Sequence, residues 1–502
     1  MSSATATSQT AGGINPDRLF LASCIALIAT AVSFAVIGDI MGALKSHFGL
    51  NNRDVGFIAG AGTWGFTLSI FALGPLCDAL GMRRLVWFAF ICHLAGAVTM
   101  IFAQGFWSLF FGALILSMGN GTVEAVCNPL VATIYPDRKT EKLNQFHVWF
   151  PGGIVIGGLA CFLLSKIGMG WQPKLGLVVL PTLVYGALFI GQSVPATERV
   201  QSGVSFADMC RSTFLRPLFL VLLFCMMITA SLELGPNRWI PSILQAGGIH
   251  GILVLVWISG IMAVLRFFAG PIVHRLSPTG LLTVSAVLTG LGLIWLSYAE
   301  TVQMAFAAAT VFALGVCYFW PTMLGVVSER VPRGGSLALA LMGGIGMLAV
   351  GMITTPWMGS IADKHLATKL PVEQTLSVLT RIKGELAGAE VKATAKQSAD
   401  IHGALDAIQS AVAKTPPGST TVAQPETANA LRTSLKTDLD TPAIKEGKAL
   451  LDPADNYGGR MSFRFLAPFA AILVVIFGFL YARDRAAGGY RAESIHSRAT
   501  DT

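Results

Sequence analysis

The stretch NGTVEAVCNPLVATIYPD, residues 120–137, places a carboxylate, Glu124, more than a helical turn inside a run of small and apolar residues. An ionised acid loses its hydration in such surroundings, so it is rare there unless it has a partner, meets a water-filled cavity or takes up a proton. Asn128 follows four residues later, on the same face of a helix. Whether this helix lies in water or in a membrane decides the class of fold.

Composition identifies the setting as a membrane. Hydrophobic residues make up 53% of the 502 residues and charged residues only 12%, with a mean hydropathy of +0.65. Reading for apolar stretches of roughly 18 or more residues gives twelve candidate spans, of which the fourth contains Glu124. The spans are 19–44, 54–76, 84–103, 106–134, 143–167, 174–194, 214–240, 249–273, 279–299, 303–328, 334–362 and 460–482.

The basic residues predict the topology. With the N-terminus in the cytoplasm, about sixteen Lys and Arg residues fall on short inner segments and about five on short outer loops, which places both termini inside. The first apolar run lacks a cleavage site and is interpreted as a retained span. The formal charge of +8 does not indicate nucleic-acid binding, because the basic residues form no stripe with interleaved aromatics. We expect a multi-pass plasma-membrane protein, with the bacterial inner membrane favoured.

A polar stretch at 193–213 divides the spans into six and six. LGPL at 73–76 is echoed by AGPI at 269–272, which favours two related bundles with a site between them, although Gly-Pro is also common at helix ends. The predicted organisation is a cytoplasmic tail 1–18, a six-helix bundle 19–194, a cytoplasmic linker 195–213, five helices of a second bundle 214–362, an extracytoplasmic insert 363–459, the last transmembrane helix 460–482 and a cytoplasmic tail 483–502.

The insert has its own pattern. Apolar residues recur at helical spacing in two runs, which predicts amphipathic helices that fold back as a hairpin. The runs are Leu376, Leu379, Ile382, Leu386 and Ile401, Leu405, Ile408, Val412. Further short helices are expected near 426–437 and 443–450. The insert is either a lid or partner-docking element over the outer mouth, or a tolerated loop elaboration.

Four charges fall inside spans: Asp39 in the first, Glu124 in the fourth, Glu233 in the seventh and Arg266 in the eighth. Each is a functional-site hypothesis, because an intramembrane ionisable residue is costly to keep. An acid that alternates between wet and dry surroundings is what proton coupling requires. The structural alternatives are that Glu124 is a partner for Arg or Asn on a neighbouring helix, and that Asp39 and Glu233 lie at helix ends. Arg266 either neutralises one of these acids or binds a substrate oxygen.

Other polar and aromatic residues complete the candidate site. His147 begins the fifth span, and Trp64, Trp239, Tyr318 and Trp320 lie in or near spans. Acids, amides and aromatic faces together suit a neutral polyhydroxylated ligand, whose hydroxyls take hydrogen bonds and whose C–H faces stack on rings. Taken singly, each Trp or Tyr near a span end is more often an interfacial anchor.

The loop GPLCDALGMRRL at 74–85 resembles the signature of the major facilitator superfamily. It keeps Gly74, Asp78, Gly81, Arg83 and Arg84, and departs with Ala79 and Met82 where the family usually has Arg and often a basic residue. The resemblance implies a loop that latches two bundles together on the inner side. We assign these residues, together with Arg266, to gating.

A narrower resemblance links VEAVCNPLVATIYPDRKTEKLN at 123–144 to the fucose/galactose/glucose proton symporter family, over nearly all the chain except the insert. It implies that Glu124 contacts sugar and couples protons, that Asp39 is a second protonation site and that Asn128 bonds the substrate. His147 stands where these symporters often carry Gln. Glu233, Trp239, Tyr318 and Trp64 are further substrate-binding candidates.

The sequence thus predicts an all-α membrane protein with the major facilitator fold, twelve transmembrane helices in two six-helix bundles and a small helical extracytoplasmic insert. The expected function is import of a sugar or sugar-like solute by proton symport through alternating access, with sodium as the other possible coupling ion and a monomer as the expected state. No cofactor, metal or enzymatic centre is expected, because no phosphate-binding loop, metal-ligand cluster or nucleophile–base pair is visible. The alternatives are a proton-driven exporter of amphiphilic molecules and a non-transporting receptor that uses the insert.

Overall fold

The computed structural model describes residues 14–48, 50, 52–390, 395–416, 418–423, 426–437 and 439–495, and within these the regular secondary structure is helical. Eleven helical stretches there are long and apolar enough to cross a membrane, and the bent pair α11 and α12 makes a twelfth if it is counted as one span. The predicted all-α architecture of about twelve spans is confirmed.

The first half of the chain forms one bundle. Its helices are α1 (Pro16–Phe48), α2 (Asn52–Leu80), α3 (Met82–Ile101), α4 (Phe106–Ile134), α5 (Lys139–Phe146), α6 (Trp149–Lys166) and α7 (Trp171–Phe189), with the short 3-10 turn η1 (Pro136–Arg138) before α5. We call this bundle the N-half. The predicted fifth span is therefore two helices, α5 and α6, separated by a break at His147 and Val148.

The second bundle, the C-half, follows two short linker helices, α8 (Glu198–Gln201) and α9 (Phe206–Phe214). Its helices are α10 (Pro217–Ala246), α11 (Gly251–Phe267), α12 (Ala269–Leu276), α13 (Pro278–Leu296), α14 (Val302–Val316), α15 (Phe319–Arg330), α16 (Gly335–Leu348), α17 (Thr355–Ala367), α21 (Pro442–Leu466) and α22 (Pro468–Ala486). The 3-10 turn η2 (Pro332–Gly334) precedes α16, and the π-helical turn η3 (Ala349–Thr354) joins α16 to α17.

One predicted span of the C-half is sharply bent. The expected span 249–273 turns by 69° between α11 and α12. Pro271 removes the N–H that would bond the Phe267 carbonyl four residues earlier, so the helix is interrupted there.

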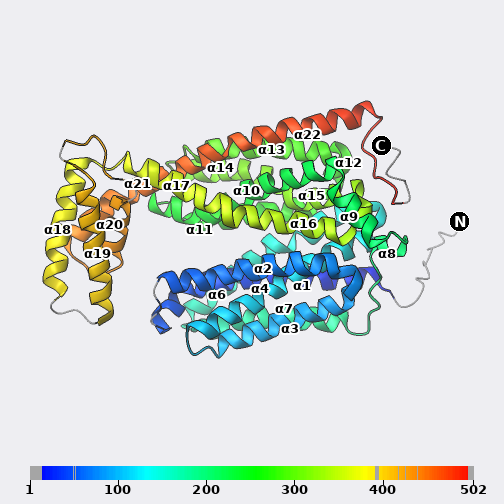
Figure 1. The fold of residues 1–502 in the computed structure, drawn as a ribbon, viewed down its shortest axis with the longest axis horizontal. Helices are drawn as coiled ribbons and strands as arrows, with labels where there is room; N and C mark the ends of the chain where they lie inside the picture. The colour runs from blue at the N-terminus through cyan, green and yellow to red at the C-terminus, as the bar shows by residue number, and fades with distance from the viewer. Residues whose placement is uncertain are drawn as a thin grey trace.

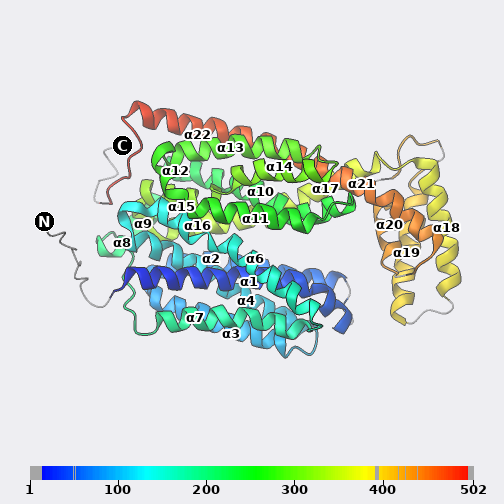
Figure 2. The same ribbon diagram turned by 180° about the vertical axis from the view of Figure 1, so that it is seen from behind.

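The two halves lie side by side with their helices roughly parallel (Figure 1). The linker helices and the described ends of the chain lie at one end of the bundle, called here the linker end, and α18 to α20 lie beyond the opposite end, called the insert end (Figures 1 and 2). The halves meet mainly where α2 packs on α16, α5 on α15 and α6 on α11. These three contacts enclose the region that holds the candidate site.

The insert is a compact helical unit with a core of its own. It consists of α18 (Val372–Glu390), α19 (Ala395–Ala413), α20 (Glu426–Leu435) and the first part of α21. The two expected amphipathic helices are present and pack on one another. In α19 the buried positions include Ala404 and Ala411, whereas Val412, expected on the apolar face, is 40% exposed.

The insert joins the C-half without a break. α21 runs from the insert into the transmembrane bundle and turns only at Ala467, so the boundary expected at 459/460 falls inside a helix. The change in composition near residue 460 marks where α21 enters apolar surroundings, whereas the helix itself begins earlier, at Pro442. Arg432 of α20 bonds Asp363 of α17 at 2.8 Å and also pairs with Asp455 of α21, which fixes the insert to the C-half.

Candidate functional site

A small cavity lies between the halves, near the middle of the membrane-spanning helices. Its volume is about 40 Å³, which leaves room for a few water molecules only. Four aromatic rings and four polar side chains dominate the lining. The N-half contributes Phe34, Phe66, Glu124, His147 and Phe150, and the C-half Glu233, Leu234, Arg266, Trp320 and Met347.

On the N-half side, Glu124, Asn128 and His147 form one hydrogen-bond network. The Asn128 amide nitrogen donates to the Glu124 backbone carbonyl at 2.8 Å and to its carboxylate Oε2 at 2.7 Å. A carbonyl oxygen only accepts, so this bond fixes the amide orientation and turns Oδ1 of Asn128 toward Nε2 of His147, 3.0 Å away. Nε2 must therefore carry the hydrogen.

Local sequence explains how these three side chains meet. Glu124 and Asn128 are one turn apart on the same face of α4. His147 lies at the break between α5 and α6, and its ring contacts Asn128 of α4. All three are almost fully buried. Nε2 of His147 is 3.9 Å from Oε2 of Glu124, so the histidine reaches the carboxylate mainly through Asn128.

On the C-half side, Glu233 of α10 and Arg266 of α11 form a buried ion pair. NH2 of Arg266 donates to Oε1 of Glu233 at 2.9 Å, and the other carboxylate oxygen, Oε2, is buried and accepts no bond from Arg266. Arg266 also donates to the carbonyls of Cys317 and His147. Because His147 belongs to the N-half, this guanidinium spans both halves at the site.

The linker end is closed by polar contacts between the halves. Asn144 of α5 donates to Thr322 of α15 at 3.1 Å, and the backbone N–H and hydroxyl of Thr140 donate to Oε1 of Glu329 at 3.0 and 2.8 Å. Lys139 adds a 2.6 Å ion pair to Glu198 of the linker helix α8. The cavity is therefore sealed from this end.

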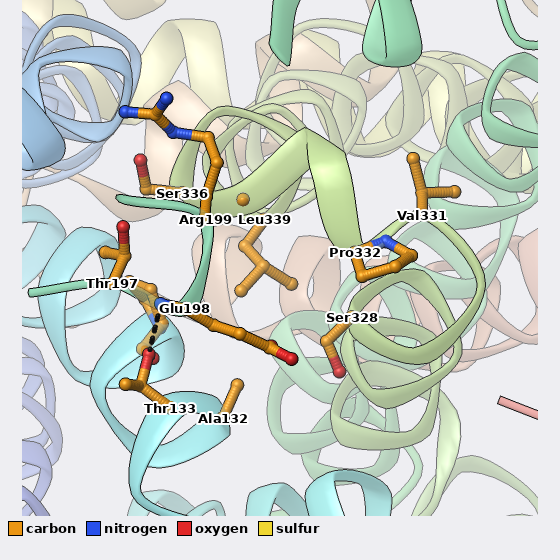
Figure 3. Close-up of a pocket in the computed structure, with 12 residues that line it drawn as sticks. Ala132, Thr133, Thr197, Glu198, Arg199, Ser328, Val331, Pro332, Ser336 and Leu339 are labelled. Carbon is orange, nitrogen blue, oxygen red and sulfur yellow. Dashed lines mark hydrogen bonds between the residues drawn. The ribbon is translucent and has the colours of Figure 1, made fainter. Parts of the chain in front are cut away.

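A second, smaller crevice lies between α4, α8 and the start of α16 at the linker end (Figure 3). Its volume is about 30 Å³, and Glu198 and Arg199 of α8 lie along its wall. The Glu198 backbone N–H donates to the Thr133 hydroxyl at 3.3 Å, the bond drawn in Figure 3. The linker helix α8 thus contacts both halves, α4 of the N-half and the start of α16 of the C-half.

The chain after α22 reinforces the same region. The Tyr490 hydroxyl donates to Oε2 of Glu329 at 2.7 Å, so Glu329 bonds the N-half with one oxygen and this tail with the other. Burial, followed by the Glu329 carboxylate, raises the pKa of Tyr490 well above its ordinary value, so the hydroxyl stays protonated and donates. Arg216 pairs with Glu493 of the tail.

The motif loop at 74–85 lies where the halves touch. Gly74 of α2 packs directly on Ala340 of α16. Asp78 accepts bonds from Arg199 and Thr197 of the linker, both at 2.5 Å, and Gly81 has φ of 82°, a conformation that favours glycine. Arg83 and Arg84, also assigned to gating, are exposed at the start of α3.

Several predicted site residues lie away from the cavity. Asp39 forms a 2.6 Å ion pair with Lys174 of α7, and its side chain is 35% exposed. Trp64 is 50% exposed and contacts Phe57 and Phe110. None of the three aromatic candidates Trp64, Trp239 and Tyr318 lines the cavity.

Tyr318 and Trp239 have structural surroundings instead. The Tyr318 hydroxyl donates to the Leu265 carbonyl at 2.9 Å, and Trp239 packs near Gly359 of α17. The cavity residues that sequence reasoning missed are Phe34, Phe66, Phe150, Leu234 and Met347. An apolar residue within an apolar span carries no signal that would have distinguished it.

Two bundles of membrane-spanning helices around a central cavity are an architecture typical of membrane transporters. A family model of the Major Facilitator Superfamily matches residues 19–356. The chain belongs to this superfamily, which confirms the resemblance read from the motif loop and the expectation of a transporter rather than an enzyme.

Curated relatives match parts of the chain. A D-xylose transporter of Levilactobacillus brevis is 26% identical over 162 residues, which are 31% of this chain and 35% of that protein. The glucose transporter GlcP of Staphylococcus epidermidis is 30% identical over 168 residues, 31% of this chain and 36% of that protein. The match thus spans about a third of the length of these relatives.

Solved structures share the fold. The transporter FucP in the outward conformation has a TM-score of 0.58 at 16% identity, covering 69% of this chain and 92% of FucP. The proton:xylose symporter XylE bound to 6-bromo-6-deoxy-D-glucose also has a TM-score of 0.58, at 13% identity, covering 70% of this chain and 90% of XylE. A bacterial homologue of the lysosomal transporter Spinster has a TM-score of 0.59 at 15% identity and covers 95% of this chain and 98% of that one.

Proposed function

We propose that the protein is a secondary active transporter that imports a sugar or sugar-like solute together with a proton by alternating access. The observation that carries the proposal is the buried Glu124–Asn128–His147 network, of which Glu124 and His147 line a cavity between the halves. Relatives named as D-xylose and glucose transporters support the solute class.

Glu124 is the acid that we assign to the proton. Glu233 is directly paired with Arg266, whereas Glu124 shares the cavity with this guanidinium but forms no ion pair with a Lys or Arg among the described residues. An ionised carboxylate without a directly paired cation is costly in an apolar enclosure, and taking up a proton removes that cost. Glu124 therefore loads a proton from water when the cavity is open on one side and releases it on the other.

Asp39 has a different role in this proposal from the one that the family resemblance implied. Its ion pair with Lys174 satisfies the carboxylate at the edge of the bundle, where the side chain is 35% exposed. Asp39 is not among the residues that line the cavity between the halves. We therefore base proton coupling on Glu124.

The cavity lining suits a sugar once the halves separate at the insert end. Hydroxyls would meet Glu124, His147 and the buried Oε2 of Glu233, and the C–H faces would meet rings such as Trp320 and Phe150. At about 40 Å³ the closed cavity holds no monosaccharide. Solute entry therefore requires an opening movement, and the sealed linker end leaves the insert end for it.

The proposal includes an orientation of the protein in the membrane. Basic residues gather at the linker end, including Arg83, Arg84, Arg138 and Arg275, which are exposed there. By the positive-inside rule this end and both termini face the cytoplasm, and the insert faces outward. We place the protein in the plasma membrane, the inner membrane if the cell is bacterial.

The test is uptake of a panel of labelled monosaccharides into proteoliposomes with an imposed pH or sodium gradient. We expect accumulation of at least one sugar to follow the pH gradient, and Glu124→Gln to abolish it while sugar exchange between the two sides continues. Asp39→Asn is the matched control, because it also replaces one acid by its amide, and we expect near-normal accumulation. Sodium-driven uptake, or unchanged pH-driven uptake by Glu124→Gln, would contradict the assignment.

A further inference from the structure

Two backbone carbonyls beside the cavity lack their usual helical donors. In an α-helix the carbonyl of residue i accepts from the N–H of residue i+4, and proline has no N–H. His147 is followed four residues later by Pro151, and Cys317 by Pro321. Each proline thus frees one carbonyl at a helix break, one between α5 and α6 and the other between α14 and α15.

The interruption is local to those two positions. One residue further along, helical bonding is regular: Gly152 N–H donates to the Val148 carbonyl at 3.0 Å, and Thr322 N–H to the Tyr318 carbonyl at 3.1 Å. A carbonyl buried in a membrane protein without a donor is costly, so a neighbouring group has to supply one.

Arg266 supplies both donors. Its Nε donates to the Cys317 carbonyl, its NH1 to the His147 carbonyl at 3.1 Å, and its NH2 to Oε1 of Glu233 at 2.9 Å. The side chain is 2% exposed. Cys317 and Glu233 belong to the same half as Arg266, whereas His147 belongs to the other half. The bond to the His147 carbonyl therefore forms only while the two halves are in contact beside the cavity.

The Glu233 carboxylate offers a second acceptor that could replace the His147 carbonyl. Oε2 of Glu233 is buried and accepts no bond from Arg266, although the same carboxylate already holds Arg266 through Oε1. A carboxylate accepts two parallel bonds from one guanidinium, the strongest geometry of this pair. The C-half therefore contains an acceptor for an N–H that leaves His147.

We propose that Arg266 is a positioning residue that holds the state closed toward the linker end: it caps the proline-freed carbonyl of His147 while the halves meet, and transfers that bond to Oε2 of Glu233 when they separate. The inference rests on the alternating access of the proposed function, but on neither its solute nor its ion. The contact also places the His147 ring, because the capped carbonyl and the ring belong to one residue.

Pro151→Ala tests the bond without removing any charge. The new N–H lies four residues after His147 and competes with Arg266 for its carbonyl. Pro321→Ala is the matched control, since it returns a donor to Cys317, whose contact with Arg266 stays within the C-half. The readout is the distance between spin labels at Asp137→Cys and Arg275→Cys, which are exposed at the linker end of the N-half and the C-half respectively, measured by pulsed electron resonance on the full chain in nanodiscs.

We expect Pro151→Ala to raise the ratio of separated to closed linker ends by about two- to tenfold, the effect of one hydrogen bond, and Pro321→Ala to leave it near the parent value. Arg266→Lys, which keeps the charge but lacks the planar fork, should raise the ratio similarly, and adding Pro151→Ala to it should change nothing further. An unchanged ratio in both Pro151→Ala and Arg266→Lys would overturn the proposal, as would equal shifts in Pro151→Ala and Pro321→Ala. The spin-label measurement uses no solute and no ion gradient. It therefore tests the role of Arg266 even if the protein transports another solute or couples to another ion.

Discussion

Gly74→Ala should open the linker end by a steric clash at one point. A β-carbon at position 74 would lie 2.0 Å from the β-carbon of Ala340, while non-bonded carbons rest roughly 3.5–4.0 Å apart. Gly74 is on α2 and Ala340 is on α16, so the clash falls between the two halves. The helices must separate locally by about 1.5 Å to accommodate the methyl group.

The expected magnitude follows from the cost of overpacking. Inserting a methyl group into a well-packed contact costs about 1–3 kcal/mol. The cost falls only on the state in which α2 and α16 meet, so the equilibrium shifts toward the separated state by about 5- to 150-fold. The clash is too severe for a side-chain rotation to relieve, because both β-carbons are fixed by the backbone.

The spin-label pair at positions 137 and 275 measures this shift directly. Gly62→Ala is the control on the same helix, because a β-carbon there would meet nothing within 4 Å. Gly74→Ala combined with Ala340→Gly moves the methyl group from one helix to the other, leaving 3.5 Å to the Ala340 α-carbon position and 3.8 Å to the Ser336 carbonyl. We expect the double variant to recover the parent distance.

The reasoning is refuted if Gly74→Ala leaves the distance distribution unchanged while the protein remains folded. It is also refuted if Ala340→Gly fails to reverse the shift, because the steric account assigns the whole effect to one pair of β-carbons. A shift in Gly62→Ala of the same size would mean that the label pair reports general damage to α2.

The tail and the insert give two further predictions. Removing the chain from Tyr490 onward should increase the fraction with separated linker ends a few-fold in the same spin-label assay. The reason is that Glu329, which also bonds the N-half, loses a hydrogen bond of about 0.5–1.5 kcal/mol. An unchanged fraction would contradict this role. Arg432→Ala should lower the free energy of local opening of α20 by about 1 kcal/mol, since its ion pairs with Asp363 and Asp455 are partly exposed. Hydrogen exchange of α20 would detect the change, and unaltered protection would exclude the anchoring contribution.

Much of the architecture follows from local sequence. Apolar stretches long enough to span a membrane, the polar division at 193–213 and the helical period of the insert are properties of neighbouring residues, so the chain itself reveals them. The loop from Gly74 to Arg84 indicated the superfamily in the same way. The acids within apolar spans, too, stood out against their apolar neighbours.

The sequence by itself determined which residues are expensive to bury, and the tertiary structure decided which partner each one has. Asp39 and Glu124 are both acids within apolar spans, yet Asp39 meets Lys174 at the edge of the bundle, whereas Glu124 meets Asn128 and a cavity. These pairings depend on the packing of helices far apart in the chain, which no local pattern encodes. For the same reason only the fold brings Arg266 to a carbonyl of the opposite half, 119 residues away.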